Sequence, residues 1–407
     1  MSKIVFFCIP AHGHTNPTLG VVRELVSEGH DVIYYSYDIM RDKIESAGAR
    51  FVSCDQYDPQ TRLSKADGER IGKDLAFSTE LIVNMTLAMD DAIARDMREL
   101  KPDVIVGDSM AFWAKLIAKK LGIPFVSSTT TFAFNRYSAK VMKREGPGLL
   151  RMLVSIPRIG RSIKRLQNKG YEVKSVLDII ANDDSTRTIV YTSPLFQPCS
   201  ETFSENYAFV GPILRDASVR ACEEADRDVE IADEGEEAPV VYISLGTVDN
   251  DHLDFYRNCL KAMEGEAWRA ILSVGTDTDI GSLSKPTPNC IVRGSVDQIA
   301  VLEKADVFLT HCGMNSVSEA LYYGVPLILC PKTPEQHGVA NRVRELGAGI
   351  FLKESTPECI RETVRFAMKD KQMRECASAI AQSFRSCGGA RAAADFILKS
   401  PQNCIEA

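Results

Sequence analysis

Short apolar runs alternate with amphipathic segments near the start of the chain. Residues 3–9 (KIVFFCI) form an apolar run typical of a buried strand, and residues 16–29 then repeat apolar side chains at helical spacing. Further strands are predicted at residues 30–36, 50–54, 103–108 and 124–130, and helices at residues 42–48 and 112–122. Short buried strands that alternate with helices are typical of a parallel sheet covered on both faces, so the pattern predicts an α/β fold.

The first predicted helix follows a turn that holds two of the six histidines. Asn16 is a suitable N-cap, Pro17 suits the first helical position, and Gly29 can end the helix. His12 and His14 would then lie in the turn between the first strand and the helix.

The alternation weakens at residues 59–100 and 132–180, which are helical in character and carry apolar residues in exposed-looking positions. A strand is predicted at residues 188–194. Residues 209–239 are acidic and poor in apolar periodicity, and their second half is interpreted as a linker.

The alternation restarts at residue 240. Strands are predicted at residues 240–246, 268–275, 290–296, 306–313, 325–331 and 349–353, and helices at 253–265, 298–305, 315–324, 337–349 and onward to the end. We therefore expect an N-terminal domain (1–213), an acidic linker (214–238), a C-terminal domain (239–383) and a helical segment (384–407) that crosses back to the N-terminal domain. Ligands bind beyond the carboxyl ends of the strands in open parallel sheets, so two Rossmann-like halves that face each other would form a cleft.

Composition narrows the class of protein. The chain has 407 residues and a net charge of −7, with no Lys/Arg cluster long enough to follow a nucleic-acid backbone. No apolar run approaches the roughly 18 residues of a membrane span, and no signal peptide is evident, so we expect a cytoplasmic protein. The twelve cysteines form no C-x-x-C pair and are interpreted as free thiols rather than metal ligands.

The segment 310–343 carries the strongest chemical signal. His311 ends a predicted strand, Gly313 allows a tight turn, and Asn315 and Ser316 open a helix whose free N–H groups could bind a phosphate or diphosphate. Glu319, one turn later, could accept hydrogen bonds from ribose hydroxyls. The alternative is that Ser316 and Glu319 form only a capping box.

This segment, with its continuation "GVP" and the pair Glu335–Gln336, closely resembles the donor-binding signature of family 1 glycosyltransferases. In that family the acidic–Gln pair holds the hydroxyls of the donor sugar. "PAHGHTNP" (10–17) looks like the N-terminal signature of bacterial macrolide- and flavonoid-type members, which have the GT-B fold. "SLGT" (244–247) resembles the loop beside the donor phosphates, and "RGSVDQIAVL" (293–302) resembles the segment that faces the base and ribose.

The resemblance covers the whole chain and departs from the family pattern at three positions. Cys312 replaces the commoner Gly, Ser295 stands where many relatives carry Trp, and Asp297 stands where Pro is usual. The implied donor-binding residues are Ser244, Gly246, Thr247, Val296, Gln298, His311, Gly313, Asn315, Ser316, Glu319, Glu335 and Gln336.

The resemblance also answers why histidines follow the first strand, because it assigns His14 the role of catalytic base. An imidazole, with an ordinary pKa of about 6.5, can take a proton from an acceptor hydroxyl near neutrality. Asp108 ends the predicted strand 103–108 and is the implied partner of His14, because the carboxyl ends of parallel strands meet at one edge. The alternative for Asp108 is a helix N-cap. We interpret His12 as a turn residue that contacts no substrate.

The implied activity is inverting transfer of a hexose, glucose by preference, from a UDP-sugar to a hydroxyl of a small apolar acceptor such as a macrolide or flavonoid. No metal is expected, because the helix N-terminus and His311 would offset the charge of the leaving diphosphate. We expect a monomer or weak dimer without nucleic-acid partners. Apolar residues in or near the two helical stretches are candidates for an acceptor pocket, with ordinary core as the alternative: Phe112, Trp113, Phe132, Phe134, Met142 and Met152.

Two other functions remain open from the residues. A nucleotide-sugar epimerase would also use two α/β halves and bind UDP, and a non-catalytic member of the fold would bind ligand only. Release of free UDP that depends on an acceptor alcohol would separate a transferase from an epimerase. A nicotinamide dehydrogenase is disfavoured, because no G-x-G-x-x-G follows the first strand.

Overall fold

The computed structural model describes residues 1–57, 74–141, 149–182, 185–214, 238–246, 252–276, 278–283 and 286–399, with the side chains of 141 and 149–155 left out. The chain forms two compact units. The N-terminal unit comprises Met1–Tyr191, Cys199–Ile213 and Gly388–Ala407, and the C-terminal unit comprises Thr192–Pro198 and Leu214–Cys387. Apart from its two end residues, the segment interpreted as a linker lies outside the described residues.

The N-terminal unit contains a parallel sheet of seven strands in the order β3-β2-β1-β4-β5-β6-β7. All the strands predicted in this half are present. Strand β7, whose three residues are only half-buried, was not predicted. The strands are β1 (Lys3–Phe7), β2 (Asp31–Ser36), β3 (Arg50–Ser53), β4 (Val104–Asp108), β5 (Phe125–Thr129), β6 (Arg187–Val190) and β7 (Tyr207–Phe209).

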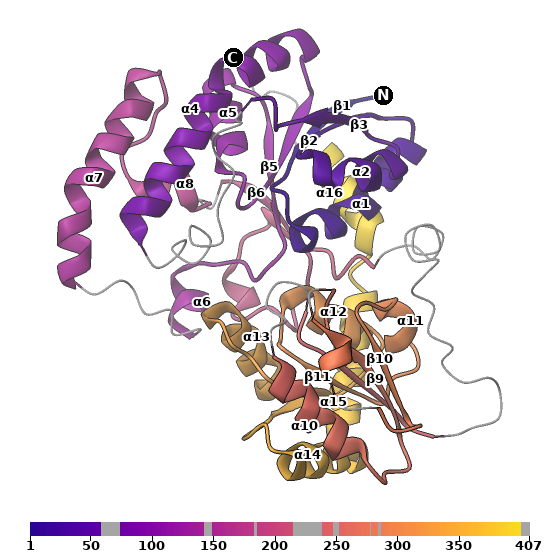
Figure 1. Ribbon diagram of the computed structural model, residues 1–407. Coiled ribbons are helices and arrows are strands. Elements are labelled where there is room, and N and C mark those ends of the chain that lie inside the picture. The colour runs from indigo at the N-terminus through magenta and orange to yellow at the C-terminus, as the bar shows by residue number, and fades with distance from the viewer. Residues whose placement is uncertain are drawn as a thin grey trace. The chain divides into compact units, whose positions relative to one another are not determined.

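Helices cover both faces of this sheet (Figure 1). Alternate residues of β1 point to opposite faces: Ile4 and Phe6 pack with α1, α2 and α16, whereas Val5 and Phe7 pack with α4, α5 and α8. The described parts of both stretches of weak alternation are mainly helical, as predicted. The helices are α1 (His12–Ser27), η1 (Asp38–Met40), α2 (Arg41–Ser46), α4 (Leu75–Leu100), α5 (Phe112–Leu121), α6 (Arg136–Val141), α7 (Leu149–Asn168), α8 (Val176–Ile180), η2 (Ser200–Thr202) and α16 (Gly389–Leu398).

Helix α16 belongs to the N-terminal unit although it follows the whole of the C-terminal unit in sequence, and Figure 1 shows it beside α1. Its residues Ala394 and Ile397 lie in the same buried cluster as Val22 of α1. Arg187 on β6 donates to the carbonyls of Phe396 and Lys399 at the end of the helix, over distances of 2.5 and 2.8 Å. The helix is therefore part of the core that supports α1.

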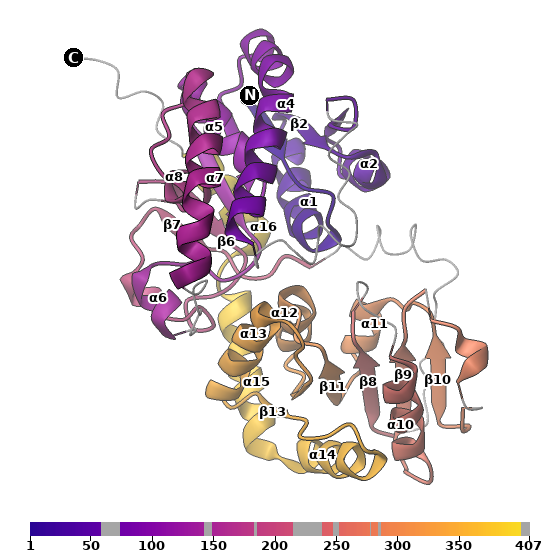
Figure 2. The same ribbon diagram turned by 60° about the vertical axis from the view of Figure 1, so that its left-hand side comes forward.

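The C-terminal unit contains a second parallel sheet of six strands in the order β10-β9-β8-β11-β12-β13 (Figure 2). The predicted alternation is confirmed throughout this unit. Its strands are β8 (Val240–Ser244), β9 (Arg269–Ser273), β10 (Cys290–Arg293), β11 (Val307–Thr310), β12 (Leu327–Leu329) and β13 (Gly349–Phe351). Its helices are α10 (Leu253–Met263), η3 (Ile280–Ser282), α11 (Gln298–Leu302), α12 (Met314–Tyr322), α13 (Pro334–Glu345), α14 (Pro357–Lys369) and α15 (Lys371–Arg385).

The predicted start of the first helix is wrong by five residues. Helix α1 begins at His12, with Ala11 as its N-cap, and Pro17 lies inside it. The backbone amides of His14 and Thr15 both bond to the carbonyl of Ala11, so the first turn forms without a side-chain cap. His12 and His14 consequently lie in the first turn of the helix and not in a preceding loop.

Both sheets reverse their strand order once, between β1 and β4 in the N-terminal unit and between β8 and β11 in the C-terminal unit. The loops that leave such neighbouring strands diverge to opposite faces, and they leave a crevice at the carboxyl edge that commonly binds ligands. None of the described helices has the length and apolar character that a membrane crossing requires.

Candidate active site

The reversal point of the N-terminal sheet brings together His14 and Asp108. Nδ1 of His14 lies 2.7 Å from Oδ2 of Asp108, although 94 positions separate the two residues. His14 follows β1 and Asp108 ends β4, which pairs directly with β1. The predicted pairing is therefore present, and its origin is the adjacency of these two strands.

Asp108 is buried, with 3% of its surface exposed, and its two oxygens have different partners. Oδ2 faces His14, while Oδ1 accepts a hydrogen bond of 2.9 Å from the backbone amide of Met110. Helix α5 has Ala111 as its N-cap, so Asp108 is not the cap of the following helix. A carboxylate fixed in this way holds the Nδ1 proton of a neutral imidazole and leaves the basic lone pair on Nε2.

Thr130 is a third member of this cluster that the sequence analysis missed. Its Oγ1 lies 3.2 Å from Nδ1 of His14, and the residue is 4% exposed. Thr130 directly follows β5, which pairs with β4, so it reaches the same edge as Asp108. The strand order is the signal that could have found it, but a run of three threonines does not show which hydroxyl is used.

The other histidine of the first turn is placed differently. The side chain of His12 is exposed, whereas 21% of the side chain of His14 is exposed beside the buried carboxylate. The structure thus brings His14, and not His12, to Asp108.

The reversal point of the C-terminal sheet brings together Ser244, Gly246, His311 and Gly313. The imidazole of His311 is packed against both glycines: an added Cβ would lie 2.6 Å from Cε1 at Gly246 and 2.6 Å from Nε2 at Gly313. Gly246 also has a positive φ of 86°, which disfavours any side chain there. These two glycines are therefore needed to seat the ring of His311.

Burial lowers the pKa of His311 to about 4, and the nearby positive charge of Lys332 adds to this effect. The backbone of Ser244 faces the ring and partly opposes the shift, but among the described residues no group meets hydrogen-bond geometry at the buried Nδ1. His311 is consequently neutral at pH 7. It can donate a hydrogen bond to a phosphate, but it brings no full charge to the site.

Helix α12 begins at Met314, one residue before the predicted start, with Gly313 as its N-cap. No side chain caps this end, so the alternative of a simple Ser316–Glu319 capping box is wrong. Asn315 and Ser316 occupy the second and third positions, where backbone N–H groups lack helical partners.

Gln298 joins Ser316 and Glu319 in one hydrogen-bonded group. Its Nε2 donates to Oγ of Ser316 at 3.3 Å and to Oε2 of Glu319, and its Oε1 accepts from the hydroxyl of Tyr242 at 3.1 Å. Asp297, at the position where Pro is usual in relatives, caps α11 through bonds to two backbone amides. Val296 is buried. The predicted residues Gln298, Ser316 and Glu319 therefore lie together. Tyr242 also belongs to this hydrogen-bonded group, and the sequence analysis did not predict it.

Gln336 has a local role that the sequence analysis missed, because α13 begins at Pro334, three residues earlier than predicted. Oε1 of Gln336 accepts from the backbone amides of Lys332 at 2.9 Å and Thr333 at 3.1 Å, which completes a capping box with Thr333. Its Nε2 group is not used in this cap. Glu335, the next residue toward the helix start, is exposed.

Cys312 adopts a φ of 67°, the left-handed region in which glycine is favoured. The residue is buried, and its amide donates to Oγ1 of Thr310 at 3.2 Å. The commoner Gly at this position in relatives is explained by this backbone conformation.

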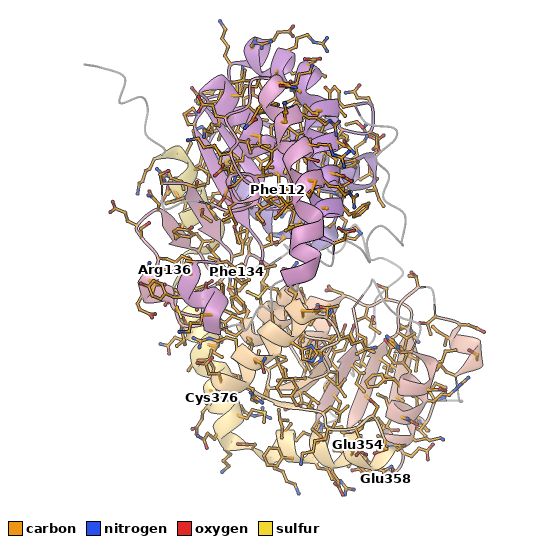
Figure 3. The ribbon with its side chains drawn as sticks, turned by 90° about the vertical axis from the view of Figure 1, so that its left-hand side faces the viewer. Phe112, Phe134, Arg136, Glu354, Glu358 and Cys376 are labelled. Atoms are coloured by element: carbon orange, nitrogen blue, oxygen red, sulfur yellow. The ribbon has the colours of Figure 1, made fainter. Side chains whose placement is uncertain are left out.

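The candidate acceptor residues do not form one group. Trp113 packs in the core between the sheet and α4, and Phe132 is also buried, so the ordinary-core alternative holds for both. Figure 3 shows Phe112 among the helices of the N-terminal unit and Phe134 apart from it, beside α6. Met142 lies outside the described residues, as does Thr247 of the predicted phosphate loop, and the side chain of Met152 is not described.

Comparisons with known proteins identify the family of the chain. Residues 258–388 match the family described as erythromycin biosynthesis protein CIII-like, C-terminal domain. The chain is similar to the NDP-glycosyltransferase YjiC of Bacillus licheniformis, with 34% identity over 402 residues, which cover 97% of this chain and 96% of that protein. It is also similar to oleandomycin glycosyltransferase of Streptomyces antibioticus, with 29% identity over 408 residues, 97% of this chain and 90% of that protein.

Among solved structures, the glycosyltransferase of kitacinnamycin aligns with a TM-score of 0.82 and 25% identity, and the alignment covers 98% of both chains. The agreement extends over both units and covers 90% or more of each of these proteins. It favours a glycosyl-transferring enzyme over the epimerase and the non-catalytic binder. From its sequence and its fold, the chain belongs to the family 1 glycosyltransferases of GT-B architecture.

Proposed function

We propose that this glycosyltransferase moves a hexose, glucose by preference, from a UDP-sugar to a hydroxyl of a small apolar natural product, with inversion at the anomeric carbon. The observation that carries the proposal is the 2.7 Å contact between His14 and Asp108, which orients the imidazole as a base. The acceptor class is supported by relatives whose names refer to macrolides, such as oleandomycin glycosyltransferase.

In the proposed reaction, Nε2 of His14 takes the proton of the acceptor hydroxyl as the oxygen attacks the anomeric carbon. The bond from that carbon to the diphosphate oxygen breaks, and its electron pair leaves with UDP. Asp108 stabilises the imidazolium that forms, because its carboxylate accepts a hydrogen bond from the Nδ1–H group and remains negatively charged. A single displacement of this kind converts an α-linked donor into a β-glycoside.

On the donor side, the backbone N–H groups at the start of α12 and the neutral ring of His311 are proposed to bind the diphosphate. Gln298 and Glu319 are proposed to bind the ribose, and Glu335 and Gln336 the sugar hydroxyls. These donors give the leaving group hydrogen-bonding partners without a metal, so we propose that none is needed.

The test is a matrix of UDP- and TDP-sugars against phenolic and macrolide acceptors, read by mass spectrometry, with and without excess chelator. We expect glycosylated product and acceptor-dependent release of free nucleotide, unchanged by the chelator. Nucleotide release without any acceptor, or epimerised sugar without transfer, would contradict the proposal. Activity that disappears in chelator and returns with magnesium would contradict only the metal-free account of the leaving group.

A further inference from the structure

The donor side of the site lacks a full positive charge among the residues assigned so far. Ser244, Gly246 and Gly313 are uncharged, and His311 is neutral because its pKa is about 4. The end of α12 contributes only about half an elementary charge. A nucleoside diphosphate carries two to three negative charges near pH 7, so a further cation at this edge would strengthen its binding.

Lys332 is placed to provide that charge. In the sheet register Thr310 of β11 is opposite Leu329 of β12, and the amide of Cys330 donates to the carbonyl of Thr310 at 2.9 Å. Lys332 follows two residues later, so it leaves the carboxyl edge beside the strand that carries His311. Its positive charge contributes to the lowered pKa of His311, in agreement with this placement.

Two contacts orient Lys332 at this edge. Its backbone amide donates to Oε1 of Gln336 at 2.9 Å, which ties it to the cap of α13. Its Nζ contacts Nε2 of His252, the N-cap residue of α10, which belongs to the connection that leaves β8. The side chain thus extends from the β12 connection toward the β8 connection, across the edge where β11 presents His311. An ammonium carries a full positive charge and has three N–H donors.

We propose that Lys332 binds the diphosphate of the nucleotide donor and supplies the full positive charge of that site. The inference rests on the proposed function, because it assumes that the C-terminal unit binds a nucleotide diphosphate. Lys332 and His311 then have complementary tasks: the lysine contributes charge, and its presence helps to keep the imidazole a neutral hydrogen-bond donor.

The experiment measures binding of UDP, TDP, UMP and uridine by calorimetry to four proteins: the wild type, Lys332→Gln, Lys332→Arg and Lys371→Gln. Lys371 is an exposed lysine at the start of α15 and serves as the matched control. We expect Lys332→Gln to lower the affinity for UDP and TDP by roughly ten-fold or more. The affinity for UMP should fall by less, and the affinity for uridine should not change. Lys332→Arg should retain most of the affinity, and Lys371→Gln all of it.

Salt gives a second measurement that a merely structural lysine would not change. The decrease of UDP affinity with added sodium chloride should be less steep in Lys332→Gln than in the wild type, since one ion pair has been removed. Unchanged uridine binding also shows that the variant is folded.

The outcomes separate the two proposals. The assignment of Lys332 is contradicted if Lys332→Gln binds all four ligands with the affinity of the wild type. It is also contradicted if the substitution lowers all four affinities by the same factor. A wild type that binds none of the nucleotides contradicts the proposed function itself.

Discussion

The hydroxyl of Thr130 and the imidazole of His14 meet at Nδ1, the same nitrogen that faces Asp108. The distances from Nδ1 are 3.2 Å to Oγ1 of Thr130 and 2.7 Å to Oδ2 of Asp108. One proton on Nδ1 can be shared between these two acceptors in a three-centre bond. The ring is then constrained from two directions, and Nε2 is the nitrogen left to act as base.

The first prediction concerns the base and its partner. His14→Ala should lower kcat by roughly 10²- to 10⁴-fold, the usual contribution of general base catalysis. UDP binding should be unchanged, because the proposed nucleotide site lies in the other unit. A variant that retains more than a few per cent of kcat would contradict the assignment, and His12→Ala serves as the control that should remain active.

Asp108→Asn should lower kcat nearly as much as His14→Ala does. The amide of Met110 already donates to Oδ1 of Asp108, so the single oxygen of an asparagine would remain there and turn its NH2 group toward His14. Donation from that NH2 group would place the imidazole proton on Nε2, the wrong tautomer for a base. Steady-state kinetics decide this, and a mild effect of Asp108→Asn would mean that the tautomer is fixed by another group.

The second prediction treats Thr130 as a positioning residue. Thr130→Val keeps the shape but removes the oxygen, and we expect kcat to fall roughly 3- to 30-fold, equivalent to one neutral hydrogen bond of about 1 kcal/mol or somewhat more. The KM for the acceptor should change little, and the midpoint of the acidic limb of the kcat–pH profile should shift. Thr130→Ser, which keeps the hydroxyl, should retain kcat and the profile of the wild type. A purely packing role would give the opposite result, an active Val variant and an impaired Ser variant.

The third prediction separates two roles of Gln336. Gln336→Glu preserves an oxygen that can complete the capping box but loses the Nε2 donor, whereas Gln336→Ala loses both. Both variants should change the ranking of donor sugars, and only the alanine should also lower the free energy of unfolding, by about 1 kcal/mol. UDP affinity and the ranking of acceptors should remain as in the wild type. Reordered acceptors with an unchanged donor ranking would contradict the placement of the sugar at Gln336.

The fourth prediction is a pH dependence of stability caused by His311. Its pKa is about 4 in the folded state and near 6.5 when unfolded, so the unfolded chain binds the extra proton first as the pH falls. The contribution of neutral His311 to the free energy of unfolding is fully present above pH 6.5. It declines as the pH falls from 6.5 to 4, by about 3 kcal/mol in total. Urea unfolding of the wild type and His311→Gln should show a difference in stability that changes across this window. A constant difference would contradict the buried neutral ring.

The fifth prediction concerns the backbone at Cys312. Replacement by Gly and by Ala removes the same thiol, but only glycine relieves the cost of a φ of 67°. Cys312→Gly should therefore be more stable than Cys312→Ala by about 1 kcal/mol. Thermal unfolding of both variants measures this, and equal stability would indicate that the backbone relaxes in the alanine variant.

The alternation of apolar and amphipathic segments was sufficient to predict nearly every strand and helix, because buried parallel strands and amphipathic helices differ in period. Helix starts were less predictable. Asn16 and Pro17 resemble a start signal, yet α1 begins at His12, since backbone bonds to Ala11 form its first turn and Pro17 omits only one later bond. The start of α13 was misplaced in the same way, and the capping role of Gln336 was missed with it.

Which residues lie together in the two candidate sites depends on the order of the strands in each sheet. The local pattern of apolar and polar residues in the sequence does not contain this order. The proximity of His14 and Asp108 was predicted from the convergence of strand ends together with the family resemblance. Thr130 and Lys332 were not, because their relevance depends on which strands are neighbours and on where a side chain points. The charge state of His311 could not be predicted either, because it depends on its burial between Gly246 and Gly313.

The position of α16 has a consequence for the order in which the protein folds during synthesis. The ribosome completes Ile213 long before it reaches Leu398, and until then the apolar residues that pack against Ala394 and Ile397 lack this cover. At translation rates of roughly 5–20 residues per second, this interval lasts on the order of ten to forty seconds. The nascent N-terminal unit, including the helix that carries His14, therefore waits with an apolar surface open to chaperones, and the second unit can complete its own sheet before the first is finished.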